Sequence, residues 1–339
     1  MKFLTLFIIG ALILTLGCIN NKKDTISSSE YSPSISSEMD TLIFSDPHNY
    51  VRTLDNSDTS TKAEIRSYKD ILALFEAHNY TSASWKAGVR EVPRIYLPII
   101  GERWGPKSSK EMVVIDKKKL FFRALAPLIL RSNELIMADR NRLKKIREGS
   151  EPSSISNDDQ KWVLKLAQVY RLSSDENTIS DELLSELWIR VDIIPVSLAL
   201  AQAAEESGWG TSRFAALGNA VYGQWSWGEN AITPEKQRKE LGNYGIASFE
   251  TLQQSICAYM LNLNTHNAYA SLRSKRAELQ KKEEKVTGHI LAGQLAKYSE
   301  RGEEYVKGLR SLMEYNRLGP ADDAYLSKEP SIYLVPVAE

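Results

Sequence analysis

Apolar residues recur at helical spacing along most of the chain. Positions three and four residues apart share an apolar face in several segments, and Ser156 and Ser180, each followed by acidic residues, are typical of helix N-termini. Pro127 lies inside the longest segment and is expected to kink or divide it. The pattern predicts helices over about 63–79, 117–147, 162–170, 183–191, 252–263, 269–280, 290–295 and 305–313.

The segment 193–204 differs from these helices because it offers no polar face. Pro195 is well placed in its first turn, and a helix that is apolar all round is buried in the centre of a fold. Gly208 and Gly210 end the helical pattern, and residues 221–247 mix aromatic, glycine and charged residues without a helical period. We therefore expect a buried central helix, followed by a small hairpin lobe or a long ordered loop.

The first residues have the layout of a secretory signal. Lys2 precedes an uncharged apolar run over 3–16, which is short for a membrane span, and a small residue and Cys18 follow it. Residues 14–18, LTLGC, resemble the lipobox of bacterial lipoproteins, which implies that Cys18 is acylated and anchors the protein in a membrane. An ordinary cleaved signal and a retained membrane anchor stay open as alternatives. In each case we expect export, and Ile19 is compatible with an outer-membrane lipoprotein that faces the periplasm of a Gram-negative cell.

Composition divides the chain into five parts. Residues from Ile19 to about Thr61 are rich in Ser, Asp, Thr and Asn and lack an apolar period, so they cannot bury enough surface to fold alone. We interpret them as a flexible tether. The expected parts are a lipoprotein signal peptide at 1–18, the tether at 19–62, an N-terminal helical region at 63–150, a main domain at 151–318 and a C-terminal tail with little pattern at 319–339.

Charge and cysteine content exclude some classes of function. The chain has 43 Lys and Arg residues against 43 Asp and Glu residues, so nothing favours a nucleic-acid partner. Cys18 and Cys257 lie far apart in unlike contexts, which argues against a disulfide framework and favours a buried thiol at Cys257. The four histidines do not cluster at metal-ligand spacing, and we expect neither a metal nor an organic cofactor. We also expect a monomer.

Two neighbouring carboxyl groups stand at the end of the apolar segment. Glu205 and Glu206 follow it directly, where the helix dipole and a low dielectric both disfavour a carboxylate and raise its pKa. A carboxyl group that stays protonated near neutral pH is suited to donate a proton to a glycosidic oxygen. The position alone does not choose between neighbours that lie about 100° apart around a helix. A second interpretation also stays open, in which both glutamates are solvated residues at the end of a helix.

A family resemblance separates the two glutamates. Residues 197–212 read SLALAQAAEESGWGTS and residues 218–225 read GNAVYGQW. Together they resemble the bacterial N-acetylglucosaminidase domain of glycoside hydrolase family 73 and, within it, the Bax-like branch. The resemblance covers about 68–318 and includes three further blocks, LIMADR at 135–140, YMLNLNTH at 259–266 and YSERGEEYV at 298–306.

The resemblance implies an α+β, mostly α-helical, lysozyme-like fold with a small β-rich lobe beside the active-site cleft. The acid of the family is the glutamate directly before Ser-Gly-Trp-Gly, which is Glu206 in this sequence. Glu205 stands where the family usually has an apolar residue, so we expect it to be secondary. The resemblance implies that Trp209 packs beneath the acid. It also implies that the main domain at 151–318 is a glucosaminidase domain.

The partner of the acid is not fixed by the sequence. Family members carry a second carboxylate in the lobe, where this chain offers Glu229, Glu235 and Glu240. Glu240 is favoured slightly over Glu235 because it precedes a turn-forming Gly-Asn-Tyr at 242–244. The acetamido oxygen of the substrate can replace such a carboxylate. The charged residues of the lobe also fit a solvated hairpin face.

Amide and aromatic side chains near the acid are candidates for binding sugar, through hydrogen bonds and stacking on the sugar ring. For Tyr222 and Trp225 a packing role is equally open. Tyr305 is expected to tie helices together. The substrate-binding candidates are Asn219, Tyr222, Gln224, Trp225 and Tyr298, with Trp227 and Tyr244 as weaker ones.

These residues lead to an expected activity. The protein is expected to cleave the β-1,4 bond after N-acetylglucosamine in peptidoglycan glycan strands, with Glu206 as the general acid. A lytic transglycosylase or muramidase of the same fold is one alternative. A cell-wall-binding module without catalysis is another, since a fold does not guarantee activity. The expected partners are the glycan strands and, through Cys18, a membrane.

Overall fold

The computed structural model describes residues 60–100, 113–149, 155–173, 179–226, 231–235 and 244–337, together with the backbone of two short strands, β1 (Leu42–Ile43) and β2 (Val51–Arg52). The expected signal peptide with Cys18, nearly all of the expected tether, and the lobe residues Glu229 and Glu240 lie outside the described residues. Within the described ranges, no helix has both the length and the apolar character needed to cross a bilayer.

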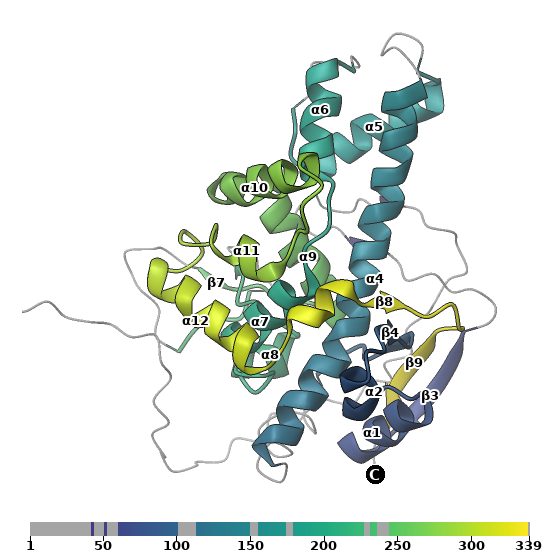
Figure 1. Ribbon diagram of the computed structural model, residues 1–339, viewed down its shortest axis with the longest axis vertical. Helices are drawn as coiled ribbons and strands as arrows, with labels where there is room; N and C mark the ends of the chain where they lie inside the picture. Colours follow the sequence, from purple (N-terminus) through teal and green to yellow (C-terminus); the bar gives the residue numbers. More distant parts are fainter. Residues whose placement is uncertain are drawn as a thin grey trace, which may run out of the picture. The chain divides into compact units, whose positions relative to one another are not determined.

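Helices make up most of the described chain (Figure 1). Each helix predicted from the apolar pattern is present, with shifted boundaries. The longest one is not divided at Pro127, because buried residues on both sides of the proline pack it into the core. The helices are α1 (Tyr68–Ala77), α2 (Ser82–Lys86), α4 (Val114–Gly149), α5 (Asn157–Val169), α6 (Asp181–Arg190), α7 (Val196–Ser207), α8 (Arg213–Gly218), α9 (Leu252–Thr265), α10 (Ala270–Lys281), α11 (Gly288–Ala292) and α12 (Glu303–Tyr315), with 3-10 turns η3 (Asn267–Tyr269) and η4 (Gly319–Asp323).

The strands are short and join distant parts of the chain. β3 (Thr61–Ile65) and β5 (Ile95–Tyr96) both pair in parallel with β9 (Ile332–Pro336), and β4 (Glu91–Val92) pairs in parallel with β8 (Tyr325–Leu326). The start of the segment 63–79 is therefore a strand and not the predicted helix. The residues predicted to form a patternless tail provide η4, β8 and β9. Both differences arise because strand pairing across the chain is invisible in local periodicity.

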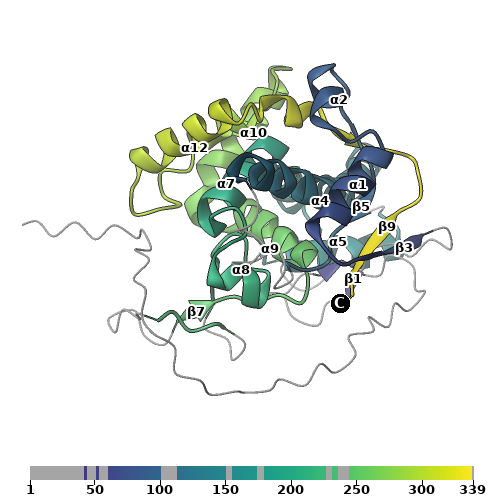
Figure 2. The ribbon, with the colours of Figure 1, turned by 90° about the horizontal axis from the view of Figure 1, so that it is seen from below.

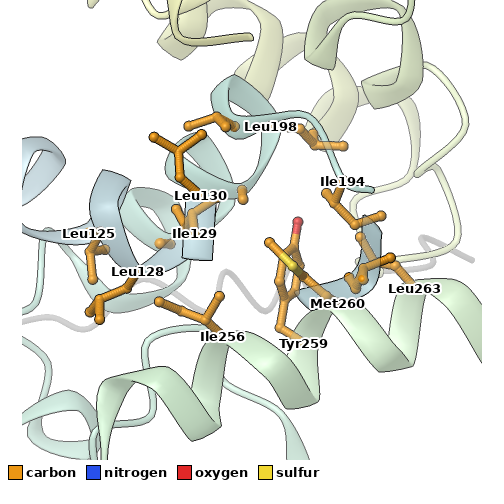
Figure 3. Packing of buried hydrophobic residues seen from close by; sticks show 14 of the residues in the cluster. Leu125, Leu128, Ile129, Leu130, Ile194, Leu198, Ile256, Tyr259, Met260 and Leu263 are labelled. Carbon is orange, nitrogen blue, oxygen red and sulfur yellow. The ribbon is translucent and has the colours of Figure 1, made fainter. Parts of the chain in front are cut away.

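The α7 helix is the predicted buried centre of the fold. Its residues from Val196 to Ala204 are at most 3% exposed, and α4, α11 and α12 pack around it. Figure 2 shows α4 and α7 side by side, and Figure 3 shows Leu130 of α4, Leu198 of α7 and Ile256 of α9 among the side chains of this interior. The fold is thus α+β, mostly helical and lysozyme-like, with small sheets.

A carboxylate from the C-terminal segment caps the start of α7. Pro195, the N-cap residue, offers no side-chain cap, and Asp322 of η4 takes this role. Asp322 accepts hydrogen bonds from the Ser197 amide (2.8 Å), the Ser197 hydroxyl (2.8 Å) and the Gly288 amide (2.9 Å). An anion at this position also interacts favourably with the positive end of the helix dipole. The segment after residue 318 is therefore part of what holds α7 in place.

Replacing Asp322 by alanine is expected to lower the free energy of unfolding by about 2 kcal/mol, because it removes a helix cap and leaves buried donors without acceptors. Chemical denaturation of both variants would measure this. Asp323→Ala is the matched control, since Asp323 is half exposed and pairs only with Lys285 among the described residues, and its loss should change stability by less than about 1 kcal/mol. Equal stability of the two variants would contradict the capping role.

Two buried arginines fix the chain just before α7. Arg140 and Arg276 lie 3.5 Å and 3.3 Å from the Asp192 carboxylate. Arg140 donates to the carbonyls of Trp188 and Val191, while Arg276 donates to those of Ile189 and Ile193. The two cations thus satisfy carbonyl groups at the end of α6 and in the segment that leads from α6 to α7. This network sets the position from which α7 starts.

Candidate active site

Glu206 lies in the last turn of α7, beside a tight left-handed turn. Gly208, Trp209 and Gly210 all have positive φ, at 57°, 56° and 74°. Ser207 holds this turn, because its hydroxyl donates to the Ala203 carbonyl (2.6 Å) and accepts from the Gly210 amide (2.8 Å). Two of the three positions are glycines, which adopt this conformation without strain. The turn ends the helix at Ser207, one residue after Glu206.

Trp209 packs against the core from this turn and is half buried. The Lys118 ammonium group of α4 lies 4.4 Å from the centre of its ring, a cation–π contact. The indole therefore anchors the turn to α4, which agrees with the packing role expected for it. A left-handed conformation at a non-glycine residue costs on the order of 1 kcal/mol, and these contacts offset that cost.

The carboxyl group of Glu206 is half buried, and this burial raises its pKa to about 7. A hydrogen bond from Tyr305 lowers the pKa in opposition, the negative charge of Glu205 raises it, and the positive charge of Arg301 lowers it. The rise expected from the helix end is thus present, with loss of hydration as its main cause. A carboxyl group with this pKa exchanges a proton readily near neutral pH.

A chain of three hydrogen bonds, two buried and the last one partly buried, ends on Glu206. Tyr259 donates to Gln202 Oε1 (2.6 Å), Gln202 Nε2 donates to the Tyr305 hydroxyl (3.0 Å), and Tyr305 donates to Glu206 Oε1 (2.9 Å). Because the Tyr305 oxygen accepts from an amide, its own proton points to Glu206. Oε1 is thereby held as an acceptor, and the acidic proton of Glu206 belongs on Oε2.

Gly223 lies next to that second oxygen. A Cβ atom added at Gly223 would lie 3.8 Å from Glu206 Oε2, and the residue has a φ of 59°. Any side chain here would be strained by the positive φ, and its Cβ atom would be in van der Waals contact with the oxygen that carries the proton. Gly223 therefore brings the backbone, without a side chain, next to Oε2.

Replacing Tyr305 by phenylalanine is expected to shift the basic limb of the pH–rate profile to higher pH. The lost hydrogen bond stabilises the ionised carboxyl group, so its removal raises the pKa of Glu206 above about 7. A general acid acts when protonated, so the rate falls as the pH rises through that pKa, and the fall begins later in the variant. We expect kcat to decrease roughly tenfold, because the carboxyl group loses its fixed orientation.

Rates measured across the pH range would show this shift. Tyr315→Phe is the matched control, because Tyr315 also lies on α12 but is 82% exposed. A basic limb that stays in place or moves to lower pH in Tyr305→Phe would contradict the arrangement.

Glu205 is held by an ion pair. Arg301 donates from Nη2 to Glu205 Oε1 at 2.6 Å, and the centre of its guanidinium lies 5.3 Å from the centre of the Tyr305 ring. Glu205 therefore faces a cation, whereas Glu206 accepts from a neutral phenol. This difference in partners fits the secondary role expected for Glu205.

Two of the sugar-binding candidates, Asn219 and Tyr222, have their polar groups or rings packed against other parts of the protein. The Asn219 amide donates to the carbonyls of Phe249 (3.0 Å) and Glu250 (3.2 Å), and its oxygen accepts from the Ile100 amide (2.9 Å). Tyr222 is 2% exposed, and its ring stacks on Tyr259 at 3.7 Å between centroids. We now expect Asn219 to join the segments at Ile100 and Phe249, and Tyr222 to pack against Tyr259, rather than to contact sugar.

Tyr298 belongs to the same aromatic cluster. Its ring stacks on Tyr305 with centroids 5.4 Å apart, and its hydroxyl donates weakly to the Tyr222 carbonyl at 3.4 Å. It is half buried, so it keeps part of its surface available. The position beside Tyr305 places Tyr298 one ring away from the acid, and its contact with substrate stays a prediction.

Gln224 and Trp225 lead into the lobe. The lobe sheet pairs β6 (Trp225–Ser226) with β7 (Gly245–Ile246) in antiparallel register. Trp225 is 49% exposed and stacks on Tyr244 with centroids 4.9 Å apart, so a second ring supports the indole. The buried Gln224 Oε1 has no hydrogen-bond partner in the described part of the chain. Both residues keep their predicted roles as sugar contacts.

The partner carboxylate is not located by the described residues. Glu235 is exposed in the lobe. Glu240 lies outside the described ranges. Both remain predictions. Within the described ranges, no cluster of three or more His, Cys, Asp or Glu side chains is arranged to hold a metal ion.

Sequence reasoning missed the residues that hold the acid. Gln202 is a polar residue in an otherwise apolar helix and lies four positions before Glu206, which places both on one helix face. That spacing was a usable signal for Gln202. Tyr305 was assigned only to helix packing, and Arg301 had no assignment, because their contacts with α7 depend on the tertiary fold.

Comparison with known proteins agrees with this geometry. Residues 181–318, which include the α7 helix and Tyr305, match the family model of the glucosaminidase domain, described as mannosyl-glycoprotein endo-beta-N-acetylglucosaminidase. The chain therefore carries a domain of the glucosaminidase class of glycosidases. Protein bax of Escherichia coli (strain K12) is 34% identical over 204 residues, which are 59% of this chain and 70% of protein bax. The chain belongs to the Bax-like family of proteins with this domain. No solved structure matches it.

Proposed function

We propose that this protein hydrolyses the β-1,4 bond after N-acetylglucosamine in peptidoglycan glycan strands, with Glu206 as the general acid. The observation that carries the proposal is the state of Glu206, a half-buried carboxyl group with a pKa of about 7 and one oxygen fixed by Tyr305. Membership of the glucosaminidase class supports the type of bond and sugar.

The first step transfers the proton of Glu206 Oε2 to the glycosidic oxygen. The C1–O bond breaks, its electron pair stays on the leaving oxygen, and positive charge develops at C1. The acetamido oxygen of the same sugar, or a lobe carboxylate such as Glu240 or Glu235, stabilises C1 from the other face. Glu206 is then ionised, and the hydrogen bond from Tyr305 and the charge of Arg301 stabilise it. In the second step Glu206 takes a proton from the water that attacks C1.

The Trp225–Tyr244 pair supports binding of the glycan beside the acid. An exposed indole backed by a second ring offers a rigid apolar face, on which the C–H face of a sugar ring stacks. In this proposal Gln224 provides an acceptor for a hydroxyl or acetamido group of the same strand.

The products of digestion test the proposed function. Purified sacculi are incubated with the protein, and the new glycan ends are reduced and weighed by mass spectrometry. Reduced N-acetylglucosamine at the ends is the expected result. Anhydromuramic ends would identify a lytic transglycosylase, and reduced muramic ends a muramidase. Binding to sacculi without any new glycan ends would indicate a wall-binding module without catalysis. Release of glycan from a mannosyl glycoprotein, without cleavage of sacculi, would show that the substrate is not peptidoglycan.

We also propose that the protein is exported and held on a membrane by lipid at Cys18. The lipobox-like residues 14–18 support this proposal. The protein expressed in a Gram-negative host should incorporate labelled fatty acid, and Cys18→Ser should abolish this incorporation. Equal labelling of both proteins, or no labelling of the unsubstituted protein, would refute the anchor at Cys18.

A further inference from the structure

In the ion pair between Arg301 and Glu205, most N–H donors of the Arg301 guanidinium form no side-chain hydrogen bond to any residue that the structure describes. The Arg301 side chain is 54% exposed and that of Glu205 is 30% exposed. A guanidinium group has five N–H donors, and the side-chain hydrogen bond to Glu205 uses one N–H of Nη2. Among the described residues, no other carboxylate forms an ion pair with Arg301. The remaining donors are therefore available to an acceptor that comes from solution.

These donors lie close to the reacting bond. The guanidinium lies against the ring of Tyr305, and the hydroxyl of that same ring donates to Glu206 Oε1. Glu205, which holds the guanidinium, precedes Glu206 directly. The positive charge of Arg301 also reaches the Glu206 carboxyl group and lowers its pKa. A ligand group bound by Arg301 would thus lie within a sugar residue or two of the bond that Glu206 cleaves.

Stability does not explain the pair. Ion pairs between partly exposed side chains contribute about 0–1 kcal/mol, since water and salt screen them. The planar fork of an arginine, in contrast, matches the two oxygens of a carboxylate and binds it by charge-assisted hydrogen bonds. Glu205 already places a carboxylate oxygen at this fork, which shows the chemistry that the site accepts.

We infer that Arg301 is a substrate-recognition residue that binds a carboxylate carried by the glycan strand, and that Glu205 occupies the guanidinium until the strand arrives. The inference rests on the proposed function and narrows its substrate class to acidic strands, as opposed to neutral N-acetylglucosamine polymers. Muramic sugars offer such a carboxylate in two forms. Their stem peptides carry carboxylates, and removal of the peptide frees the carboxylate of the lactyl group.

Binding of defined strands to the full-length Glu206→Gln protein tests the inference without turnover. Titration calorimetry would use three ligands: soluble strands with stem peptides, the same strands stripped by an amidase, and stripped strands whose lactyl carboxylates are converted to methyl amides. We expect the neutral strands to bind roughly tenfold to a hundredfold more weakly than the better acidic ligand. The acidic ligand that binds more tightly identifies the source of the carboxylate.

Substitutions of Arg301 and Glu205 then test whether these two residues cause the preference for acidic strands. Arg301→Gln should remove the preference for acidic strands and leave the affinity for neutral strands within about twofold, and Arg301→Lys should restore part of it, as a point charge without the fork. Glu205→Gln should strengthen binding of acidic strands, because it removes the internal competitor. Lys307→Gln is the matched control, since Lys307 is 71% exposed and pairs with Glu304.

Three results would overturn the inference. They are equal affinity of the parent protein for acidic and neutral strands, an unchanged preference in Arg301→Gln, and weaker binding of acidic strands by Glu205→Gln. Failure of the proposed function is a separate result, because it appears as the absence of new N-acetylglucosamine ends with the unsubstituted protein, whatever the binding data show.

Discussion

Replacement of Glu206 by glutamine is expected to reduce the rate of glycan cleavage by about a hundredfold to ten-thousandfold, the usual contribution of a general acid. The amide has the shape of the carboxyl group, and its oxygen still accepts the hydrogen bond from Tyr305. It has no acidic proton to give to the leaving oxygen. The fold should persist, because the substitution removes no packing atoms. Release of new reducing ends from sacculi would measure the rate, and thermal unfolding would check the fold.

Glu205→Gln is the matched control for this experiment. The two residues are neighbours with the same side chain, but Glu205 pairs with Arg301 and is not held by Tyr305. We expect Glu205→Gln to retain kcat within about tenfold, since it affects Glu206 only through the surrounding charge. If Glu205→Gln is the inactive variant and Glu206→Gln keeps its rate, the assignment of the acid is wrong.

Arg276→Met is expected to lower the free energy of unfolding by about 3–5 kcal/mol. Arg276 is fully buried, and its loss leaves the Asp192 carboxylate with one cation fewer and the carbonyl groups of Ile189 and Ile193 without a donor. In a chain of this size, such a loss lowers Tm on the order of 10 °C. Differential scanning calorimetry or chemical denaturation would measure the effect.

Lys275→Met is the matched control for the buried cation. Lys275 is the preceding residue on α10, is partly exposed and pairs with Glu278. Its replacement should change stability by less than about 1 kcal/mol. Similar stability of the two variants would show that α6 and α7 do not depend on the buried arginine.

The helical part of the fold follows from the sequence because its signal is local. Apolar spacing and capping serines placed α5 and α6, and the absence of a polar face marked α7 as the buried helix. The strands do not follow in this way. β3 is short and pairs with residues near the other end of the chain, and β9 is preceded by prolines and charged residues that hide its role.

In the candidate site, too, the features set by local sequence were predictable and those set by tertiary packing were not. The position of Glu206 at the end of an apolar helix was readable, and so were the glycines of the turn after it. Its hydrogen-bond partner was not, because Tyr305 reaches Glu206 only when α12 packs against α7. The two aromatic candidates differ in exposure, since Tyr222 is buried and Trp225 is not, and local sequence does not report the exposure of a side chain.

The pairing of β3 with β9 has a mechanical consequence. The two strands run in parallel, in register from Thr61 opposite Ile332 to Ile65 opposite Pro336. A pull on the chain before Thr61, directed along β3, loads all the hydrogen bonds of this pair in shear, so that they resist together and do not open one after another. If lipid at Cys18 anchors the protein as proposed, tension on the anchor would reach β3 in this direction. The C-terminal segment, which also caps α7, would then act as the clamp that keeps tension from peeling the folded body open at its first strand.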